Sequence, residues 1–162
     1  KDNVEAARLY RLAADQGFAN AQYNLGVMYT NGYGVSEDYV EAVRWYRLAA
    51  DQGFANAQSN LGAMYDNGYG VSKDNVEAAR LYRLAADQGY ALAQYNLGYM
   101  YADGYGVSED YVEAYMWLNL AAAQGNANAR EAKSIIEEFM TRDQIAEGQR
   151  MSKEWMARHP PE

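Results

Sequence analysis

The sequence lacks cysteine altogether and contains a single histidine, His159, among its 162 residues. Without cysteine no disulfide can form, so packing alone must hold the fold together. The same two absences exclude zinc sites and the histidine-dependent catalytic triads. We therefore predict no cofactor, no metal site and no enzymatic activity of the chain's own.

Positive charge is also scarce, because 14 lysine and arginine residues stand against 22 aspartate and glutamate residues, which gives a net charge of −8. Such an acidic chain repels phosphate backbones, which argues against nucleic acid as a partner. No stretch approaches the roughly 18 apolar residues that a membrane-spanning helix needs, so we expect no direct membrane insertion.

The chain begins at Lys1, without a methionine and midway through a repeat, which indicates a fragment or a processed form. The start shows no signal-peptide pattern, but this says little about the compartment because the start is expected to be truncated. A cytoplasmic location and an exported one, periplasmic or secreted, are therefore both compatible with the sequence, and the oligomeric state is left open.

Tyrosine dominates the aromatic residues, with 16 tyrosines against three phenylalanines and three tryptophans. A hydrophobic content of 49% is incompatible with a disordered chain. Because tyrosine combines an apolar ring with a polar hydroxyl, it suits half-buried positions and contact surfaces. The composition therefore indicates a folded protein that is well supplied with residues for making contacts.

A 36-residue repeat is the main feature of the sequence. Residues 3–38 differ from residues 39–74 at seven of 36 positions and from residues 75–110 at five. The copies also alternate in pairs, which indicates that a 72-residue pair was itself duplicated, in evolution or by a designer. Glycines mark the spacing at Gly17, Gly53, Gly89 and Gly125.

Each repeat contains two helical patterns, because apolar residues recur at the spacing of a helix turn. Asp38 and Glu41 predict an N-cap with a reciprocal partner, and Gly32 and Gly53 lie where a left-handed residue ends a helix. Asp74 with Glu77 and Asp110 with Glu113 repeat the capping pair. First helices are predicted at residues 19–31, 55–67 and 91–103. Second helices are predicted at residues 2–16, 38–52, 74–88 and 110–124.

Beyond residue 124 the repeat breaks, and the next helical pattern, residues 127–139, becomes charged. A last helix is predicted at residues 141–158, opened by a capping box of Thr141 and Gln144. Terminal repeats of a stacked array need a polar outer face, so this helix is expected to cover the end of the stack. The residues expected to do so are Ile145, Met151, Trp155 and Met156.

A two-helix unit cannot bury its apolar face alone, whereas stacked copies can. We therefore predict a single all-α domain, a right-handed superhelical α/α solenoid of 36-residue helix-turn-helix repeats with a C-terminal capping helix. The predicted boundaries are a partial first repeat at residues 1–18, full repeats at 19–54, 55–90 and 91–126, a divergent helix at 127–140, and the capping helix and tail at 141–162.

The repeat resembles the Sel1-like repeat (SLR), a relative of the tetratricopeptide repeat. The matching residues are Ala21, Leu25, Gly26, Tyr29, Gly32, Gly34, Val35, Asp38, Ala42, Trp45, Tyr46, Ala49, Ala50, Gln52 and Gly53, and they recur in the next two units. The resemblance implies a curved solenoid whose first helices line the concave side, and a role as an adaptor in protein quality control, signalling, bacterial secretion or host interaction. A cysteine-rich bacterial branch staples each unit with a disulfide, and this chain departs from that branch.

Five positions of the first helix differ among the three copies, and at about 100° per residue they fall on one arc of roughly 100°. Packing fixes the opposite face, so the arc is free to diverge, and the resemblance implies that it lines the concave groove. The alternative is that these positions drift because nothing touches them. The predicted binding residues for a protein or peptide, with the asparagines that border the arc, are Asn20, Tyr23, Asn24, Val27, Asn31, Asn56, Ser59, Asn60, Asp66, Asn67, Tyr95, Asn96, Tyr99 and Asp103.

The asparagines Asn24, Asn60 and Asn96 are unusual, because asparagine is a poor helix former in the middle of a helix. One explanation is an internal hydrogen bond to the neighbouring repeat. The other is a ladder that grips the partner's backbone, since an amide side chain can donate and accept at once. Both explanations stay open at this stage.

The leading functional hypothesis is a protein-interaction scaffold that binds a peptide or a protein surface in the concave groove. An alternative is a structural module of a longer protein, or a designed repeat array, without a dedicated ligand. A weaker alternative is a cell-wall or antibiotic hydrolase, an activity ascribed to the cysteine-rich branch. The missing nucleophile–base pair argues against the hydrolase.

Overall fold

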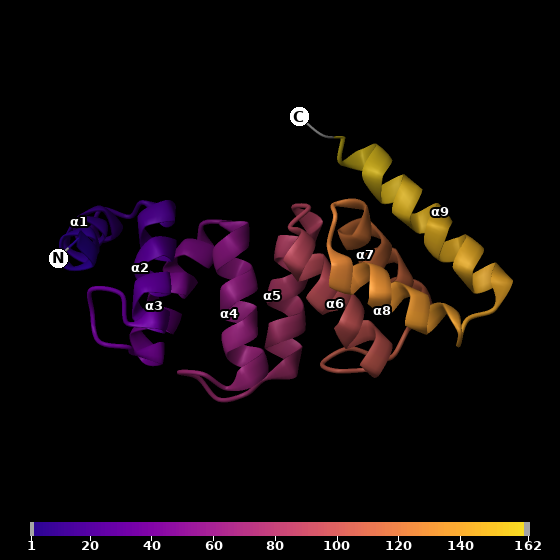
Figure 1. Ribbon diagram of the computed structural model, residues 1–162, viewed down its shortest axis with the longest axis horizontal. Coiled ribbons are helices and arrows are strands. Elements are labelled where there is room, and N and C mark those ends of the chain that lie inside the picture. Colours follow the sequence, from indigo (N-terminus) through magenta and orange to yellow (C-terminus); the bar gives the residue numbers. More distant parts are fainter. Residues whose placement is uncertain (1, 161–162) are drawn as a thin grey trace. The chain divides into compact units, whose positions relative to one another are not determined.

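The computed structural model of the protein describes residues 2–160, and these residues form nine α-helices and no strand (Figure 1). The prediction of an all-α repeat solenoid is confirmed, with each predicted helix present. Lys1 and residues 161–162, at the two ends of the predicted domain, lie outside the described residues. The helices are α1 (Asp2–Asp15), α2 (Ala19–Asn31), α3 (Tyr39–Asp51), α4 (Ala55–Asn67), α5 (Asn75–Asp87), α6 (Ala91–Asp103), α7 (Tyr111–Ala123), α8 (Ala127–Glu137) and α9 (Arg142–Arg158).

The chain divides into two compact units, residues 1–84 and residues 85–162. Unit 1 contains α1 to α4 and most of α5. Unit 2 contains the end of α5 and α6 to α9. In each unit, a first helix packs against the second helix of its own repeat, as α2 does on α3 and α6 on α7.

The second helices begin at an aspartate, as predicted. The Asp38 carboxylate accepts hydrogen bonds from the backbone N–H groups of Val40 and Glu41, both at 3.0 Å. The predicted reciprocal half is wrong, because the Asp38 N–H donates to the Tyr29 carbonyl and the Glu41 carboxylate pairs with Arg44. The preceding first helix therefore supplies the acceptor that a capping box would have supplied. Asp74 and Asp110 make the same cap and donate to the preceding first helix in the same way.

Glycine is required where the first helix ends and the chain turns back. Gly32 has a φ of 68°, and Gly53, after the second helix, has a φ of 85°, which confirms both predicted left-handed positions. Gly70 is constrained further, because a Cβ atom there would lie 2.2 Å from the Tyr39 carbonyl oxygen. The second glycine of the Gly-x-Gly link thus lets the loop touch the preceding second helix.

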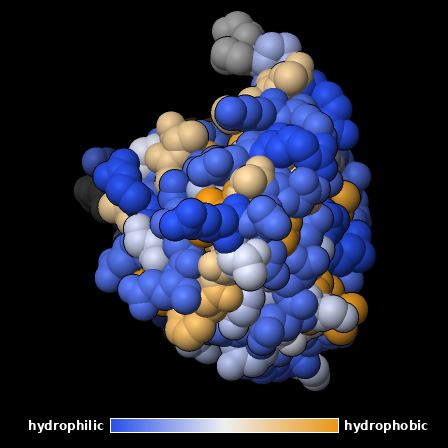
Figure 2. Space-filling model, turned by 90° about the vertical axis from the view of Figure 1, so that its right-hand side faces the viewer, coloured by the Kyte–Doolittle hydropathy of each residue, from blue (hydrophilic) through white to orange (hydrophobic). Residues whose placement is uncertain are grey.

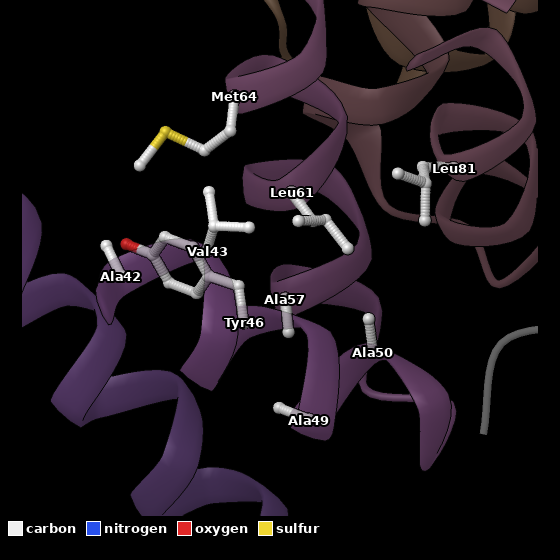
Figure 3. Packing of buried hydrophobic residues seen from close by; sticks show 9 residues of the cluster. All are labelled: Ala42, Val43, Tyr46, Ala49, Ala50, Ala57, Leu61, Met64 and Leu81. Carbon is white, nitrogen blue, oxygen red and sulfur yellow. The ribbon is translucent and has the colours of Figure 1, made fainter. Parts of the chain in front are cut away.

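The core of unit 1 lies where α3 meets α4, and it is rich in alanine, which lets the helices approach closely (Figure 3). Leu81 joins this core from α5. On its other side, Trp45 of α3 packs with Ala14, Ala21 and Leu25, which belong to α1 and α2. A second helix therefore buries side chains toward both neighbouring repeats. The core residues are Ala42, Val43, Tyr46, Ala49, Ala50, Ala57, Leu61, Met64 and Leu81.

Pairs of one buried and one exposed glutamine connect consecutive repeats. In unit 1 the Gln52 amide donates to the Gly17 carbonyl at 2.9 Å and to the Gln22 side-chain oxygen at 2.7 Å. The Gln22 amide in turn donates to the Ala14 carbonyl at 3.2 Å. Because an unpaired buried amide is costly, this chain of bonds favours one register of stacking. In unit 2 the same bonds join Gln124 to Gly89 and Gln94, and Gln94 to Ala86.

The last helix, α9, packs on α7. Gly148 lies so close to Tyr115 that a Cβ atom there would be 2.5 Å from the ring. One and two turns further along α9, Ser152 is fully buried and the ring of Trp155 lies 6.3 Å from that of Trp117. The predicted capping box is confirmed, since the Thr141 and Gln144 side chains bond each other's backbone N–H groups.

The face of α7 under α9 has lost the charges of the other second helices. Arg44, Arg47 and Asp51 are exposed on α3. At the same repeat positions α7 carries Met116, Asn119 and Ala123. Burying an unpaired charge costs several kcal/mol, so the neutral Met116 and Ala123 permit α9 to lie on α7. Asn119 instead accepts a hydrogen bond from Lys133 of α8.

The cap differs in part from the expectation. Trp155 is buried and Ile145 packs on the core of unit 2, but Met156 is 41% exposed. Met156 follows Trp155 by one residue, about 100° around the helix, so it points away when Trp155 points inward. Figure 2 shows the molecule from the right-hand side of Figure 1, and this face is mostly hydrophilic with scattered apolar patches.

Leu120→Ala tests the packing of α9 on α7. Leu120 is 3% exposed, whereas Leu48, at the same repeat position of α3, is 41% exposed. Leu120→Ala should lower the free energy of unfolding by about 2–4 kcal/mol, because it removes a buried side chain and leaves a cavity. Leu48→Ala should cost less than about 1 kcal/mol. Denaturant titrations of both variants check this, and equal losses would contradict the packing described.

Gly26→Ala tests the contact between first and second helices. An added Cβ at Gly26 would lie 2.6 Å from the Tyr46 ring, whereas one at Gly62 would lie 3.0 Å from the Tyr82 ring. Both substitutions gain about 1 kcal/mol of helix propensity. Overpacking should make Gly26→Ala destabilising by about 1–2 kcal/mol net, and Gly62→Ala distinctly less so. Thermal unfolding of the two variants measures the difference, and the reverse order would refute it.

Candidate functional site

The first helices separate a fixed face from a variable one. On α2 the buried side chains are Ala21, Leu25 and Met28, while Asn20 and Asn31 of the variable arc are exposed. On α4 the buried side chains at the same positions are Ala57, Leu61 and Met64. The arc predicted from the sequence is mixed in these helices: Asn20, Asn31 and Asn67 are exposed, whereas Tyr23 and Val27 pack against the core.

In unit 1 the variable arcs of α2 and α4 border an open pocket of about 250 Å³. Thr30 comes from α2, Asn60 and Asn67 come from α4, and the Tyr46 side chain reaches it from α3. Tyr69, in the loop after α4, forms one side. Ala63 and Met64 complete the lining. The pocket thus combines an apolar floor with side-chain amides and hydroxyls.

The Tyr46 hydroxyl is the best-defined polar group of this pocket. It lies 3.0 Å from the Thr30 hydroxyl, which itself lies 3.0 Å from the Gly26 carbonyl. Burial raises the pKa of Tyr46, and hydrogen bonds from Thr30 and Asn60 oppose that rise. The hydroxyl therefore stays protonated at neutral pH and is held in place by neighbours on both first helices.

The mid-helix asparagines differ in their roles. Asn60 lies close enough to the Tyr46 hydroxyl of the preceding repeat to oppose the rise in the pKa of Tyr46, which favours an internal contact as its explanation. The Asn24 amide donates instead to Asn20 of its own helix, at 2.9 Å to the carbonyl and 2.8 Å to the side chain. Asn96 is half-buried. Asn24 and Asn60, the two mid-helix asparagines of unit 1, therefore do not form a uniform asparagine ladder.

Several predicted residues are less accessible than expected. Ser59 is only 2% exposed, so a partner cannot reach it. Tyr23, at the same repeat position, is half-buried, with its ring 5.9 Å from Tyr46 and 5.3 Å from Phe54. Tyr95, the third copy, packs on the core of unit 2. Tyr23, Ser59 and Tyr95 occupy one repeat position at the edge of the arc. At this position both a serine and a tyrosine are packed against neighbouring residues.

The remaining predicted residues lie at the surface or partly so. Val27, Asn56 and Asp66 are half-buried. The Asn31 and Asn67 amides each donate to a carbonyl four residues earlier in their own helix, at 2.8 Å. Their backbone acceptors are Val27 and Ala63.

In unit 2 the arc of α6 presents an exposed aromatic pair. Tyr99 is 49% exposed and Tyr105 is 50% exposed, with ring centroids 6.5 Å apart. A hydrogen bond to the Asp103 carboxylate raises the pKa of Tyr99, and the negative charge of Asp103 adds to the rise. Asp103 is itself exposed, so an aromatic surface and a carboxylate lie together here.

Tyr46 and Tyr69 were missed by sequence reasoning. Comparing copies finds positions that vary, whereas Tyr33, Tyr69 and Tyr105 are identical in all three Gly-Tyr-Gly links. The recurrence of a large aromatic residue in an otherwise polar loop was the available signal. These three tyrosines are half-exposed in the structure.

Charge is segregated between the two kinds of helix. Arginines on the second helices pair with glutamates three residues earlier, as Arg8 does with Glu5 and Arg80 with Glu77, both at 2.7 Å. In contrast, α2, α4 and α6 contain no lysine or arginine, and their charged residues are Asp66 and Asp103. The variable arcs therefore present a neutral to acidic surface.

The described residues offer little else for chemistry. No group of three or more histidine, cysteine, aspartate or glutamate side chains among residues 2–160 could hold a metal ion. Within the same residues, no helix combines the length and apolar character needed to cross a bilayer.

Known structures with a related fold include two Sel1-type proteins. The Sel1 repeat protein from Oxalobacter formigenes is 40% identical over 75% of this chain and 50% of that chain, with a TM-score of 0.72. The protective antigen c5321 of uropathogenic Escherichia coli, which displays an SLR fold, is 30% identical over 93% of this chain and 40% of that chain, with a TM-score of 0.73. The chain thus spans half or less of either protein.

No curated protein matches the sequence. The family model for the Sel1 repeat matches four segments, residues 1–18, 19–54, 55–90 and 91–126. These segments cover most of the chain and coincide with the repeats read from the glycine spacing. The chain belongs to the Sel1 repeat family.

Proposed function

We propose that the chain is a protein-interaction scaffold, and that the variable arcs of its first helices bind an extended peptide or a strip of a partner's surface. The pocket between α2 and α4 carries this proposal. Sel1 repeats generally serve as protein-interaction scaffolds, which agrees with this role. The chain itself contributes binding and positioning, and no catalytic step.

The lining of the pocket suits a polypeptide backbone. Peptide groups need a donor and an acceptor at short spacing, and the amides of Asn60 and Asn67 offer both. Tyr69 offers an exposed ring beside them, stacked at 5.2 Å on Tyr39. Tyrosine is enriched at protein interfaces because it adds contact area at low entropic cost. Ala63 and Met64 form an apolar floor that can contact the partner's side chains.

Asn60→Ala combined with Tyr69→Ala tests the site. Peptides selected from a random displayed library for binding to the intact chain serve as probes. The double variant should bind them at least about tenfold more weakly, because it removes hydrogen-bonding groups and an aromatic contact. Titration calorimetry measures the affinities.

Leu48→Ala is the matched control, because Leu48 is exposed on α3, outside the pocket. Its affinity should equal that of the unmodified chain, and circular dichroism should show all variants folded. A library that yields no binder, or binders that respond to Leu48→Ala and ignore the double variant, would refute the proposal.

A further inference from the structure

The arc of α6 differs from its counterparts in unit 1 at two positions that lie one turn apart. Tyr99 replaces the residues at positions 27 and 63, which are valine and alanine, and Asp103 replaces asparagine at positions 31 and 67. Together with Tyr105, these substitutions place two half-exposed rings beside a carboxylate. No other copy of the repeat carries this combination.

The change from asparagine to aspartate frees a polar side chain from its helix. Asn31 and Asn67 donate to carbonyls of their own helices at 2.8 Å. A carboxylate has no hydrogen to donate, so Asp103 cannot make that bond. It meets the Tyr99 hydroxyl instead, which raises the pKa of Tyr99. The second oxygen and the net charge of Asp103 face a surface that is exposed.

The charges around Tyr99, Asp103 and Tyr105 favour a positively charged ligand. α6 contains no lysine or arginine, and the charged residue that acts on the Tyr99 hydroxyl is Asp103. An exposed carboxylate beside tyrosine rings attracts a cation through both its charge and the negative faces of the rings.

The chain itself shows how such a cation would sit. The Arg47 guanidinium lies 5.9 Å from the centroid of the Tyr65 ring and also bonds its hydroxyl. Arg11 contacts Tyr29 in the same way, with the guanidinium 5.6 Å from the ring centroid. Guanidinium fits this geometry better than ammonium, because it is planar, stacks on rings and bonds a carboxylate with two N–H groups.

We propose that Tyr99, Asp103 and Tyr105 form a subsite for an arginine side chain of a partner polypeptide. The guanidinium stacks against the two rings and donates to the Asp103 carboxylate. The inference rests on the proposed scaffold function and adds the chemistry of one partner residue. It predicts that partners engage unit 2 through a basic residue.

The test uses N-acetyl-arginine methylamide as the probe, followed by nuclear magnetic resonance of the intact chain. The probe should cause saturable shifts of the Tyr99 and Tyr105 ring signals. Its citrulline counterpart, which has the same shape without the charge, should bind about tenfold more weakly, because charge-assisted hydrogen bonds are the stronger kind. Raising the salt concentration should weaken the arginine probe, since the site is exposed.

Asp103→Asn and Tyr99→Val each introduce the residue that another copy of the repeat already carries, so both variants should fold. Asp103→Asn should weaken the arginine probe about tenfold and leave the citrulline probe unchanged. Tyr99→Val should weaken it about threefold to fivefold through loss of the ring. Tyr33→Ala is the matched control, because Tyr33 is equally exposed in the corresponding loop of unit 1 but has neither partner residue.

Equal binding of arginine and citrulline, or indifference to Asp103→Asn, overturns the subsite. If the corresponding lysine derivative binds as tightly as the arginine probe, the choice of a guanidinium group is wrong. The scaffold proposal has a separate readout in the library peptides and the Asn60 and Tyr69 variants. If the arginine probe shifts the ring signals but no library peptide binds at the unit 1 pocket, only the scaffold proposal fails. If library peptides bind there but the arginine probe shifts no ring signal, only the subsite fails.

Discussion

The structure depends on second helices that are packed on two sides at once. In unit 1, Trp45 packs back against α1 and α2, the alanines of α3 pack with α4, and Tyr46 contacts both α2 and α4. Such a helix still exchanges one buried residue for another, since Val43 and Tyr115, or Tyr46 and Leu118, occupy the same repeat position. The first helix meets its repeat partner along one face through residues such as Gly26. Its other face is packed less completely, although Tyr23 and Ser59 on that side still contact neighbouring residues.

Much of this could be predicted from the sequence, because the features that set helix limits recur together. Gly32 and Gly53 have a positive φ that few other residues adopt, and the Asp38 side chain caps the helix that follows, so their spacing located the helix ends. Which variable residues are accessible could not be predicted in the same way. Tyr23 and Ser59 vary between copies yet pack against neighbours, since variation reports tolerance to change and not exposure. Tyr69 is constant yet exposed, so a search for variation was bound to miss it.

The position of α9 shows how a single repeat is altered to end the stack. The sequence predicted a capping helix, but a helical pattern alone does not say which face it covers. The signal lay in α7, where Met116, Asn119 and Ala123 take the places of two arginines and an aspartate. The same replacement changes the neighbouring contacts. Glu113, which has no arginine three residues later, accepts a hydrogen bond from the Trp117 indole at 3.2 Å. In α3 the equivalent glutamate pairs with Arg44, and the Trp45 indole N–H is left without a partner.

Arginine placement links stability to the surface left for binding. On the second helices the guanidinium groups are occupied by glutamates in the same helix, as Arg8 is by Glu5, or by tyrosines of the following first helix, as Arg47 is by Tyr65. Each exposed pair contributes little to stability, but together they keep positive charge on the second helices. The first helices α2, α4 and α6 contain no basic residue, and their arcs carry hydroxyl, amide and carboxylate groups. In the proposed scaffold, changing an exposed arc residue such as Asn31 or Asp103 would alter recognition of a partner while leaving the packed face behind it in place.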